Sequence, residues 1–305
     1  MEKHKEAPKK VLLTGATGFT GSYVLRALLQ AGWWVDILVR PSSALGMIED
    51  VKSKVGIHIY NGTLDDAMHI VSVTSPDVVI HVASMVVSEH KPNDVTALIE
   101  SNILLGTQLL ESMAKVGVKY FLNTGTYWEH FHNREYSPVG LYAASKFAFQ
   151  NILQYYVELK GIESITLKLY DAYGANDPRS KLINLLFRAA ETGELILMTE
   201  GEQKIDLIHV LDVAEAYISA ASRLLNDSVH GHEIYGVGSG NHLAVREVVK
   251  VFESVCGKKL NIEWGKRPYR EREVMEPCRL ESLPGWRPRI ELVKGITLLL
   301  SGKKD

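Results

Sequence analysis

Cysteine is almost absent from this sequence of 305 residues, which contains only Cys256 and Cys278. The two form no recognisable metal-binding or redox spacing, which predicts reduced thiols and a cytoplasmic location. Long apolar runs are absent as well, since none approaches the roughly 20 residues that a membrane span needs. Residues 1–5 are polar and lack the apolar segment of a secretory signal, so we expect a short disordered tail there.

A large excess of either charge is also missing, because the formal net charge is only -2. A polyanionic ligand usually requires a basic face, so neither a nucleic acid nor a membrane surface is expected as a partner. The hydrophobic content of 46% is ordinary for a soluble globular protein. A chain of this length can bury one large core, or one core and a smaller second lobe.

Short apolar runs alternate with longer amphipathic segments in the first half of the chain. This alternation is typical of a parallel sheet with helices on both faces, and it predicts a doubly wound α/β fold of the Rossmann type. The expected strands are Val11–Leu13, Val35–Val39, Ile57–Tyr60, Val78–Ile80, Tyr120–Leu122 and Ser164–Leu169, and the expected helices are Ser22–Ala31, Ala97–Ala114 and Ala143–Leu159.

The pattern loosens after Tyr173-Gly174, where a second, smaller α/β lobe is expected to begin. We expect residues 1–172, with 205–236 returning to them, to form the first domain, and 173–204 with 237–305 to form the lobe. The expected elements here are helices Leu182–Ala190, Val213–Leu224, Val245–Val255 and Leu292–Leu300, and strands Leu195–Met198 and Ile205–Val210.

A glycine-rich turn separates the first expected strand from the first expected helix. A tight turn needs residues without Cβ, a pyrophosphate must approach the backbone closely, and the helix N-terminus offers unpaired N–H groups. This G-x-x-G-x-x-G pattern differs from G-x-G-x-x-G but has the same mechanics, and it predicts a bound nicotinamide dinucleotide; a turn without ligand is the alternative. The expected contacts are Thr14, Gly15, Thr17, Gly18, Phe19, Thr20 and Gly21.

The end of the second strand should meet the adenosine ribose. An acidic residue there would bind the 2′-hydroxyl of NAD, but Asp36 lies too early, in the body of the strand. Arg40 instead offers a planar cation for a 2′-phosphate, and Ser42 and Ser43 add hydroxyl donors. The sequence therefore favours NADP over NAD, with a solvated arginine at a strand end as the alternative.

Tyr142 and Lys146 lie four residues apart in an expected helix, which places the phenol and the ammonium on one helical face. A nearby cation stabilises phenolate, so we expect Lys146 to lower the pKa of Tyr142 and make it a usable general acid. The spacing alone is a weak signal. It gains weight because Thr124 ends the fifth strand, beside the expected nicotinamide, where its hydroxyl can meet the same substrate oxygen.

With these motifs the chain resembles the extended short-chain dehydrogenase/reductase family of nucleotide-sugar epimerases, dehydratases and ketoreductases. The resemblance covers nearly the whole chain and rests on an ordered series of matches. The matching segments are Thr14–Gly21, His81–Ser84, Asn102–Thr107, Tyr142–Lys146, Tyr173-Gly174, Ile208–Ala214 and Gly285–Pro288.

The family implies a catalytic trio of Thr124, Tyr142 and Lys146, with Lys146 also holding the nicotinamide ribose. It implies that Asn102 supports a proton-relay water. It also implies a homodimer paired through helices 97–114 and 143–159, although burial inside the monomer would explain their apolar content equally well. The remaining cofactor contacts that the resemblance implies are Thr63 and Leu64 beside adenine, and Val82, Ala83, Ser84 and Tyr170.

Gly125-Thr126 distinguishes among the members of this family. Its dehydratases carry an Asp-Glu pair directly after the catalytic threonine, because eliminating water needs its own acid and base, so a dehydratase is not expected. Epimerases and dehydratases reuse one tightly held NAD, whereas a reductase exchanges its cofactor and commonly uses NADPH. Arg40 and the absent acid–base pair therefore both favour a ketoreductase.

Three further segments resemble the subgroup typified by CDP-abequose and CDP-paratose synthases: Phe121–Thr124, Gly201–Gln203 and Arg272–Met275. This implies NADPH-dependent reduction of the C4 ketone of a nucleotide-linked 4-keto-6-deoxyhexose, with a CDP-sugar favoured. Two alternatives stay open. One is an epimerase that retains NAD, and the other is a non-catalytic NADP-sensing protein, which the presence of the complete trio argues against.

The substrate nucleotide is expected to meet basic side chains. The family usually has an Arg-Asp pair where this chain has Ile205-Asp206, so Lys204 would supply the charge for the diphosphate. Arg267 matches the family's other phosphate-binding arginine, with Arg270 and Arg272 close by, and a solvated loop is the alternative for that stretch.

The sugar is expected to lie against the segment that follows the fifth strand. Thr126 and Trp128, with His130 and His132, are the candidates for lining its pocket. The two histidines have no third ligand nearby in the sequence, so no metal site is expected.

Overall fold

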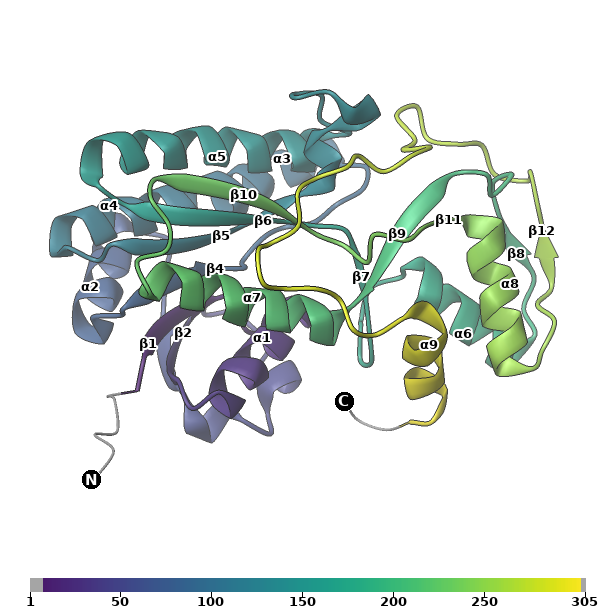
Figure 1. Ribbon diagram of the computed structural model, residues 1–305, viewed down its shortest axis with the longest axis horizontal. Coiled ribbons are helices and arrows are strands. Elements are labelled where there is room, and N and C mark those ends of the chain that lie inside the picture. The colour runs from purple at the N-terminus through teal and green to yellow at the C-terminus, as the bar shows by residue number, and fades with distance from the viewer. Residues whose placement is uncertain (1–7, 303–305) are drawn as a thin grey trace.

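The computed structural model describes residues 8–302, so the tail expected at residues 1–5 lies outside the described residues. A seven-stranded parallel sheet forms the centre, in the strand order β10-β6-β5-β4-β1-β2-β3 (Figure 1). This confirms the predicted Rossmann-type α/β fold. The strands are β1 Lys10–Thr14, β2 Trp34–Val39, β3 Gly56–Ile59, β4 Val78–His81, β5 Tyr120–Thr126, β6 Glu163–Leu169 and β10 His232–Val237.

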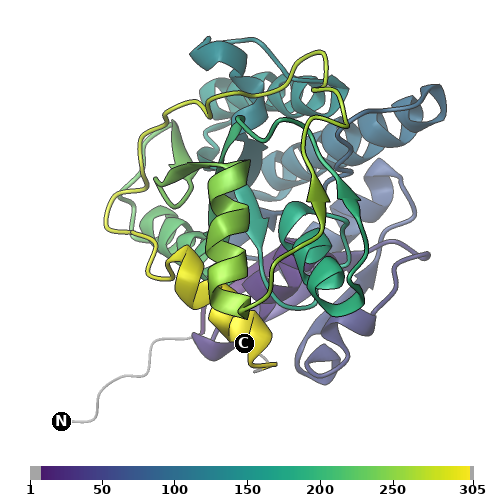
Figure 2. The same ribbon diagram turned by 90° about the vertical axis from the view of Figure 1, so that its right-hand side faces the viewer.

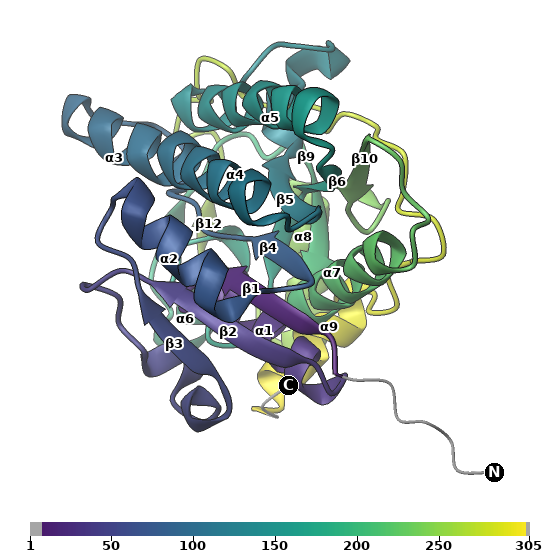
Figure 3. The ribbon, with the colours of Figure 1, turned by 90° about the vertical axis from the view of Figure 1, so that its left-hand side faces the viewer.

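Helices cover both faces of this sheet (Figure 3). Successive residues of a strand point to opposite faces, so Val11 and Leu13 pack in the core under α1 and α7, whereas Leu12 packs under α2, α4 and α5. The two faces are therefore two separate apolar layers. The helices are α1 Phe19–Gln30 and α7 Val210–Leu225 on one face, and α2 Leu64–Thr74, α4 Leu105–Val116 and α5 Leu141–Lys160 on the other.

A smaller lobe with its own apolar core lies beyond the carboxyl ends of the strands of the large sheet (Figures 1 and 2). Strand β9 belongs to this lobe rather than to the large sheet, so the chain returns to the first domain at α7 and not at residue 205. The lobe contains β7 Asp171–Tyr173, β9 Lys204–His209 and β11 His242–Ala244 in one sheet, β8 Ile196–Leu197 paired with β12 Ile262–Glu263, and helices α6 Leu182–Thr192, α8 Val245–Cys256 and α9 Leu292–Leu300.

The C-terminal segment between β12 and α9 crosses back from the lobe to the sheet (Figure 1). The Gly236 N–H on β10 donates to Glu281 O at 2.7 Å, and the Tyr170 hydroxyl donates to Cys278 O at 2.6 Å. Further along, the Ile290 N–H donates to the carboxylate of Asp212 at the start of α7, at 2.9 Å. The lobe is therefore fastened to the large domain along this segment.

The helix predicted at 97–114 is not regular. It consists of α3 Val95–Ile99, a π-type turn Glu100–Leu104 and α4. Asn102 lies in this wide turn, and its side chain points inward. Short 3-10 turns complete the chain at Gly46–Ile48, Lys52–Lys54, Pro92–Asp94, Tyr127–Glu129 and Phe131–Asn133. Among the residues the structure describes, no helix is long and apolar enough to cross a membrane.

Gly106, inside α4, lets that helix pack against Phe149 of α5. A Cβ at this position would stand 2.4 Å from two atoms of the Phe149 ring. Alanine is about 1 kcal/mol better than glycine in a helix, but overpacking a core costs about 1–3 kcal/mol. We therefore expect Gly106→Ala to lower the free energy of unfolding, measured by urea denaturation. Gly106→Ala with Phe149→Leu should recover most of the loss, and a Gly106→Ala protein more stable than the native one would contradict this packing.

Candidate active site

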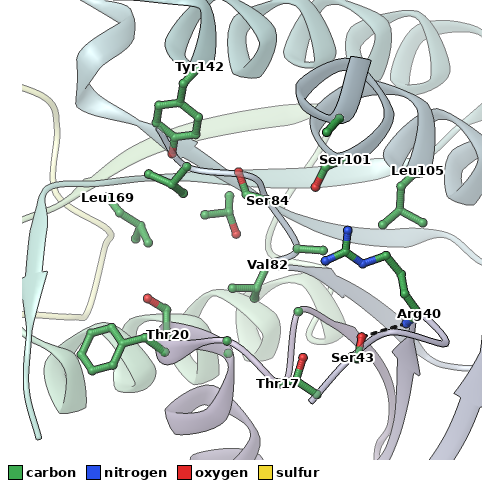
Figure 4. Close-up of a pocket in the computed structure, with 18 of the residues that line it drawn as sticks. Thr17, Thr20, Arg40, Ser43, Val82, Ser84, Ser101, Leu105, Tyr142 and Leu169 are labelled. Carbon is green, nitrogen blue, oxygen red and sulfur yellow. Dashed lines mark hydrogen bonds between the residues drawn. The ribbon is translucent and has the colours of Figure 1, made fainter. Parts of the chain in front are cut away.

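A cavity of about 960 Å³ opens at the carboxyl ends of the central strands, between the sheet and the lobe (Figure 4). Ligands of open parallel sheets bind at this edge, so its position agrees with a dinucleotide site. Most of the predicted site residues line it. They are Gly15, Thr17, Gly18, Phe19, Thr20, Gly21, Arg40, Ser42, Ser43, Val82, Ala83, Ser84, Thr124, Thr126, Trp128, Tyr142 and Tyr170.

The glycine turn after β1 packs closely against the loop that follows β4. Gly15 has a φ of 75°, and a Cβ there would lie 2.5 Å from Ala83 N. A Cβ on Gly21, in the first turn of α1, would lie 2.0 Å from Gly15 O, so the turn also packs closely on the helix. Thr14 is buried behind the turn and outside the cavity, where its hydroxyl oxygen accepts from Ala83 N at 3.1 Å.

Arg40 follows β2, and its side chain reaches into the cavity toward Val82 and Ser101 (Figure 4). Its backbone N–H donates to the Ser43 hydroxyl at 3.0 Å, which shapes the turn after the strand. Asp36 is engaged elsewhere, since its carboxylate lies 2.7 Å from His58 Nε2. Arg40 is therefore the cation at this end of the cavity, and Glu100 is an acidic residue that also lines it.

Thr63 and Leu64 lie outside the cavity, contrary to the expectation that they meet adenine. The Thr63 hydroxyl accepts from the Asp66 N–H at 3.1 Å and caps α2, which begins at Leu64. The cavity is lined instead by Asn61 and Gly62, directly before them. The residues that line the cavity thus lie in the same loop as the predicted pair but one to three positions earlier.

Tyr142 and Lys146 lie one turn apart on α5, and both are buried. The Tyr142 hydroxyl points into the cavity toward Ser84 (Figure 4). Burial, followed by the charge of Glu129, raises the pKa of Tyr142 to about 12, while hydrogen bonds with Thr126 and Ser84 and the charge of Arg179 act in the opposite direction. The expected lowering of this pKa by Lys146 is thus wrong, because desolvation of the phenolate dominates.

Lys146 Nζ is buried and has no hydrogen-bond partner among the described residues. Burial lowers the pKa of Lys146 to about 8, and the charge of Glu129 raises it again in part. A buried ammonium without a partner is costly, and a ribose hydroxyl would supply the missing acceptor. Together with the backbone cradle at Gly15, this unpartnered donor fits a nicotinamide dinucleotide.

Thr124 lines the cavity, but its hydroxyl faces the strands. It donates to His81 O at 2.7 Å, so the Tyr217 hydroxyl, 2.6 Å away on α7, donates to Thr124. A substrate carbonyl oxygen needs a donor, and the one Thr124 proton is already given to His81. In this arrangement Thr124 orders the strand ends, and the Thr126 and Ser84 hydroxyls are those that contact Tyr142.

Asn102 is fully buried and does not line the cavity. Its Oδ1 accepts from the Ser84 hydroxyl and the Met85 N–H, and its Nδ2 donates to Met85 O and the Ser145 hydroxyl. These four bonds use the full capacity of the amide, so none is left for the expected relay water. Asn102 instead joins the loop after β4 to α5 and so holds Ser84 beside Tyr142.

The basic residues expected to bind the substrate lie away from the cavity. Lys204 is 2.9 Å from Glu276 on the surface, and Arg267 is exposed. Arg179 and Lys181, which the sequence analysis missed, line the cavity instead. Their loop after β7 shows no signal in the sequence beyond the turn around Pro178, because only the folded lobe turns it toward Trp128.

Basic side chains gather around Trp128, which lines the cavity. The Lys181 ammonium lies 5.6 Å from its ring centroid and the Arg270 guanidinium 5.1 Å, so cations approach this indole from two segments. His130 and His132 do not line the cavity, contrary to expectation. Within residues 8–302, no group of three or more His, Cys, Asp or Glu residues could hold a metal ion.

The model of the NAD dependent epimerase/dehydratase family matches residues 11–238. The chain belongs to this family. The family is one of NAD(P)-dependent enzymes, and its match confirms the resemblance to the extended short-chain dehydrogenase/reductases.

Relatives and similar structures span nearly the whole chain. CDP-abequose synthase of Salmonella muenchen is 28% identical over 97% of this chain and 98% of the relative, and that of Yersinia pseudotuberculosis is 26% identical over 88% and 91%. A UDP-glucose 4-epimerase of Thermotoga maritima, solved with UDP-glucose, has a TM-score of 0.83 at 21% identity over 96% and 97%. The Thermus thermophilus UDP-glucose 4-epimerase, solved with NAD, has a TM-score of 0.78 at 24% identity over 97% and 100%.

We expect Gly15→Ala to abolish dinucleotide binding, measured by quenching of intrinsic fluorescence with NADH and NADPH. The matched control is Gly32→Ala, because Gly32 has a similar φ of 78° but no atom within 4 Å of a Cβ. The left-handed backbone alone costs about 1–2 kcal/mol in both variants, whereas only Gly15→Ala forces Ala83 away. Equal, undiminished binding by both variants would contradict the cradle.

Proposed function

We propose that this chain reduces the C4 ketone of a nucleotide-linked 4-keto-6-deoxyhexose with NADPH, and that a CDP-linked sugar is the favoured substrate. The observation that carries the proposal is the buried Tyr142 phenol, which points into the cavity and, with its pKa raised to about 12, carries its proton at neutral pH. A protonated phenol beside a hydride donor is the arrangement that ketone reduction requires.

In the proposed reaction the nicotinamide, when bound, supplies a hydride to the C4 carbonyl carbon. Tyr142 donates its proton to the carbonyl oxygen, so that hydride and proton together give a C4 hydroxyl. Thr126 and Ser84, which hydrogen-bond Tyr142, orient this proton in the role that the sequence suggested for Thr124. Lys146 binds the ribose and places its charge behind the phenol.

Gly125 supports reduction over dehydration. A Cβ at this position would lie 3.0 Å from Glu129 Oε1 and from Lys168 Cγ, so the space that an aspartate would need is already filled. Thr126 follows it and carries a hydroxyl rather than a carboxyl group. The site therefore holds the acid for protonating a ketone but no acid–base pair at these positions for eliminating water.

Arg40 at the adenosine end supports NADP, whereas the Thermus thermophilus enzyme was solved with NAD. The two similar structures described above are UDP-glucose 4-epimerases, so an epimerase that retains NAD is the second candidate. Purified protein that carried oxidised cofactor through a column would favour that candidate.

Arg179 and Lys181 are the proposed contacts of the substrate diphosphate. Both line the cavity, and Arg179 is oriented by Asp177, whose carboxylate lies 2.7 Å from its Nε. We also propose a cytoplasmic homodimer paired through α4 and α5, since Val116, Tyr155 and Leu159 expose apolar surface there.

The proposal is tested by mixing the protein with NADPH or NADH and a panel of nucleotide-linked 4-keto-6-deoxyhexoses. Loss of reduced-cofactor absorbance with a CDP-linked ketosugar is the expected result. No turnover of any ketosugar would contradict the proposed reaction and return the choice to the epimerase or the sensor.

Tyr142→Phe should reduce turnover of the ketosugar by about 10²–10⁴-fold, because it removes the general acid. Dinucleotide affinity, measured by fluorescence titration, should stay unchanged, since the ring remains in place. Full activity of the variant would show that another group protonates the oxygen.

Arg40→Ala should weaken NADPH binding by about 10–150-fold, equivalent to the roughly 1.5–3 kcal/mol of a hydrogen bond to a charged group. The affinity for NADH serves as the internal control and should not change, because NADH lacks the 2′-phosphate. An equal loss of both affinities would refute the NADP assignment and leave Arg40 a role in the shape of the turn.

A further inference from the structure

A buried ion pair lies directly beneath the catalytic end of the cavity. The side chains of Glu129 and Lys168 are almost fully buried, and Glu129 Oε2 lies 2.9 Å from Lys168 Nζ. The Lys168 ammonium also lies 2.6 Å from His130 Nε2. Burying two charges costs free energy even when they are paired, so a pair at this depth indicates a purpose beyond stability.

The other carboxylate oxygen of the pair connects it to the reacting groups. Glu129 Oε1 accepts from the Thr126 N–H at 2.9 Å, and this closes the turn that follows β5. The Thr126 hydroxyl in turn contacts the Tyr142 phenol. A continuous chain of polar contacts therefore runs from Lys168 on β6, through Glu129 and Thr126, to the phenol on α5. Gly125 leaves the room in which the carboxylate lies.

The charges around the phenol and the ammonium can be assigned group by group. Glu129 and Arg179 face Tyr142, together with the Ser84 and Thr126 hydroxyls. Glu129 and the neutral, buried His81 face Lys146. Glu129 itself is faced by Lys168, with His130 and the Cys278 thiol nearby. Glu129 is thus the anion that acts on both catalytic side chains, raising the pKa of each.

We propose that Glu129 is a positioning residue of the ketone reduction, which holds Thr126 against Tyr142 and supplies the buried negative charge that acts on the Lys146 ammonium. Lys168 holds the carboxylate in place through the 2.9 Å contact. The role in ketone reduction rests on the proposed function. The electrostatic coupling itself does not rest on it.

The test measures the coupling without any substrate. The Lys146 side-chain signal, assigned by its loss in Lys146→Arg, is followed by ¹³C NMR as a function of pH. In the native protein it should titrate near pH 8. Glu129→Gln keeps the acceptor for the Thr126 N–H but removes the charge, so Lys146 should titrate about 1 pH unit lower. Glu233→Gln, which breaks a partly exposed pair with Arg223 in the same domain, should leave the titration unchanged.

The second readout is the pH profile of ketosugar reduction. Lys146 is charged below its pKa and loses its proton above it, so the alkaline limb of kcat should move to lower pH in Glu129→Gln. A shift of about 1 unit gives about 10-fold lower kcat on that limb, with KM little changed. If Glu129→Gln does not fold, the double variant Glu129→Gln, Lys168→Met removes both charges and should show a smaller shift in the same direction.

The outcomes separate the two proposals. A folded variant in which neither the Lys146 titration nor the alkaline limb moves would overturn the role of Glu129. A moved titration in a protein that reduces no ketosugar would support the coupling and refute the proposed function. A shift in both readouts, absent from Glu233→Gln, would support both.

Discussion

Hydrogen bonds of His81, at the end of β4, connect the carboxyl ends of β1, β4 and β5. Its ring nitrogen Nδ1 lies 2.8 Å from the Thr14 hydroxyl of β1, and its carbonyl accepts from Thr124 of β5. Burial, together with the charge of Lys146, lowers the pKa of His81 to about 3, so the ring stays neutral and these bonds persist across the physiological range. The glycine turn, the loop after β4 and the end of β5 face one cavity because this buried group aligns them.

Burial determines the protonation behaviour of the two candidate catalytic side chains. Both charged forms are poorly solvated when buried, so the Tyr142 phenol holds its proton more tightly and the Lys146 ammonium less tightly. Glu129 adds negative charge beneath them and partly restores the ammonium. A phenol that keeps its proton is suited to act as the acid of the proposed reduction.

Much of this arrangement could be predicted from local sequence, and the exceptions share one physical cause. The glycine turn and the Tyr142–Lys146 spacing are determined within a few residues, so reading them needs no tertiary structure. The partners of Asn102 lie 17 to 43 residues away, and the Thr124 proton goes to a carbonyl 43 residues away. Arg179 and Lys181 reach the cavity only because the lobe folds their loop inward. Sequence periodicity contains no information on contacts between residues so far apart. The motif matches at Lys204 and Arg267 did not supply this information either.

The C-terminal segment that returns from the lobe to β10 and α7 has a mechanical consequence. A lobe joined to the sheet by a single covalent connection could rotate away as an independent arm. In this protein the segment between β12 and α9 forms a further connection, through hydrogen bonds at Gly236, Tyr170 and Asp212. Opening by rotation would break all three bonds at once, so small sliding movements are the ones with low energetic cost. We therefore expect the two walls of the cavity to keep a nearly constant separation when ligands exchange.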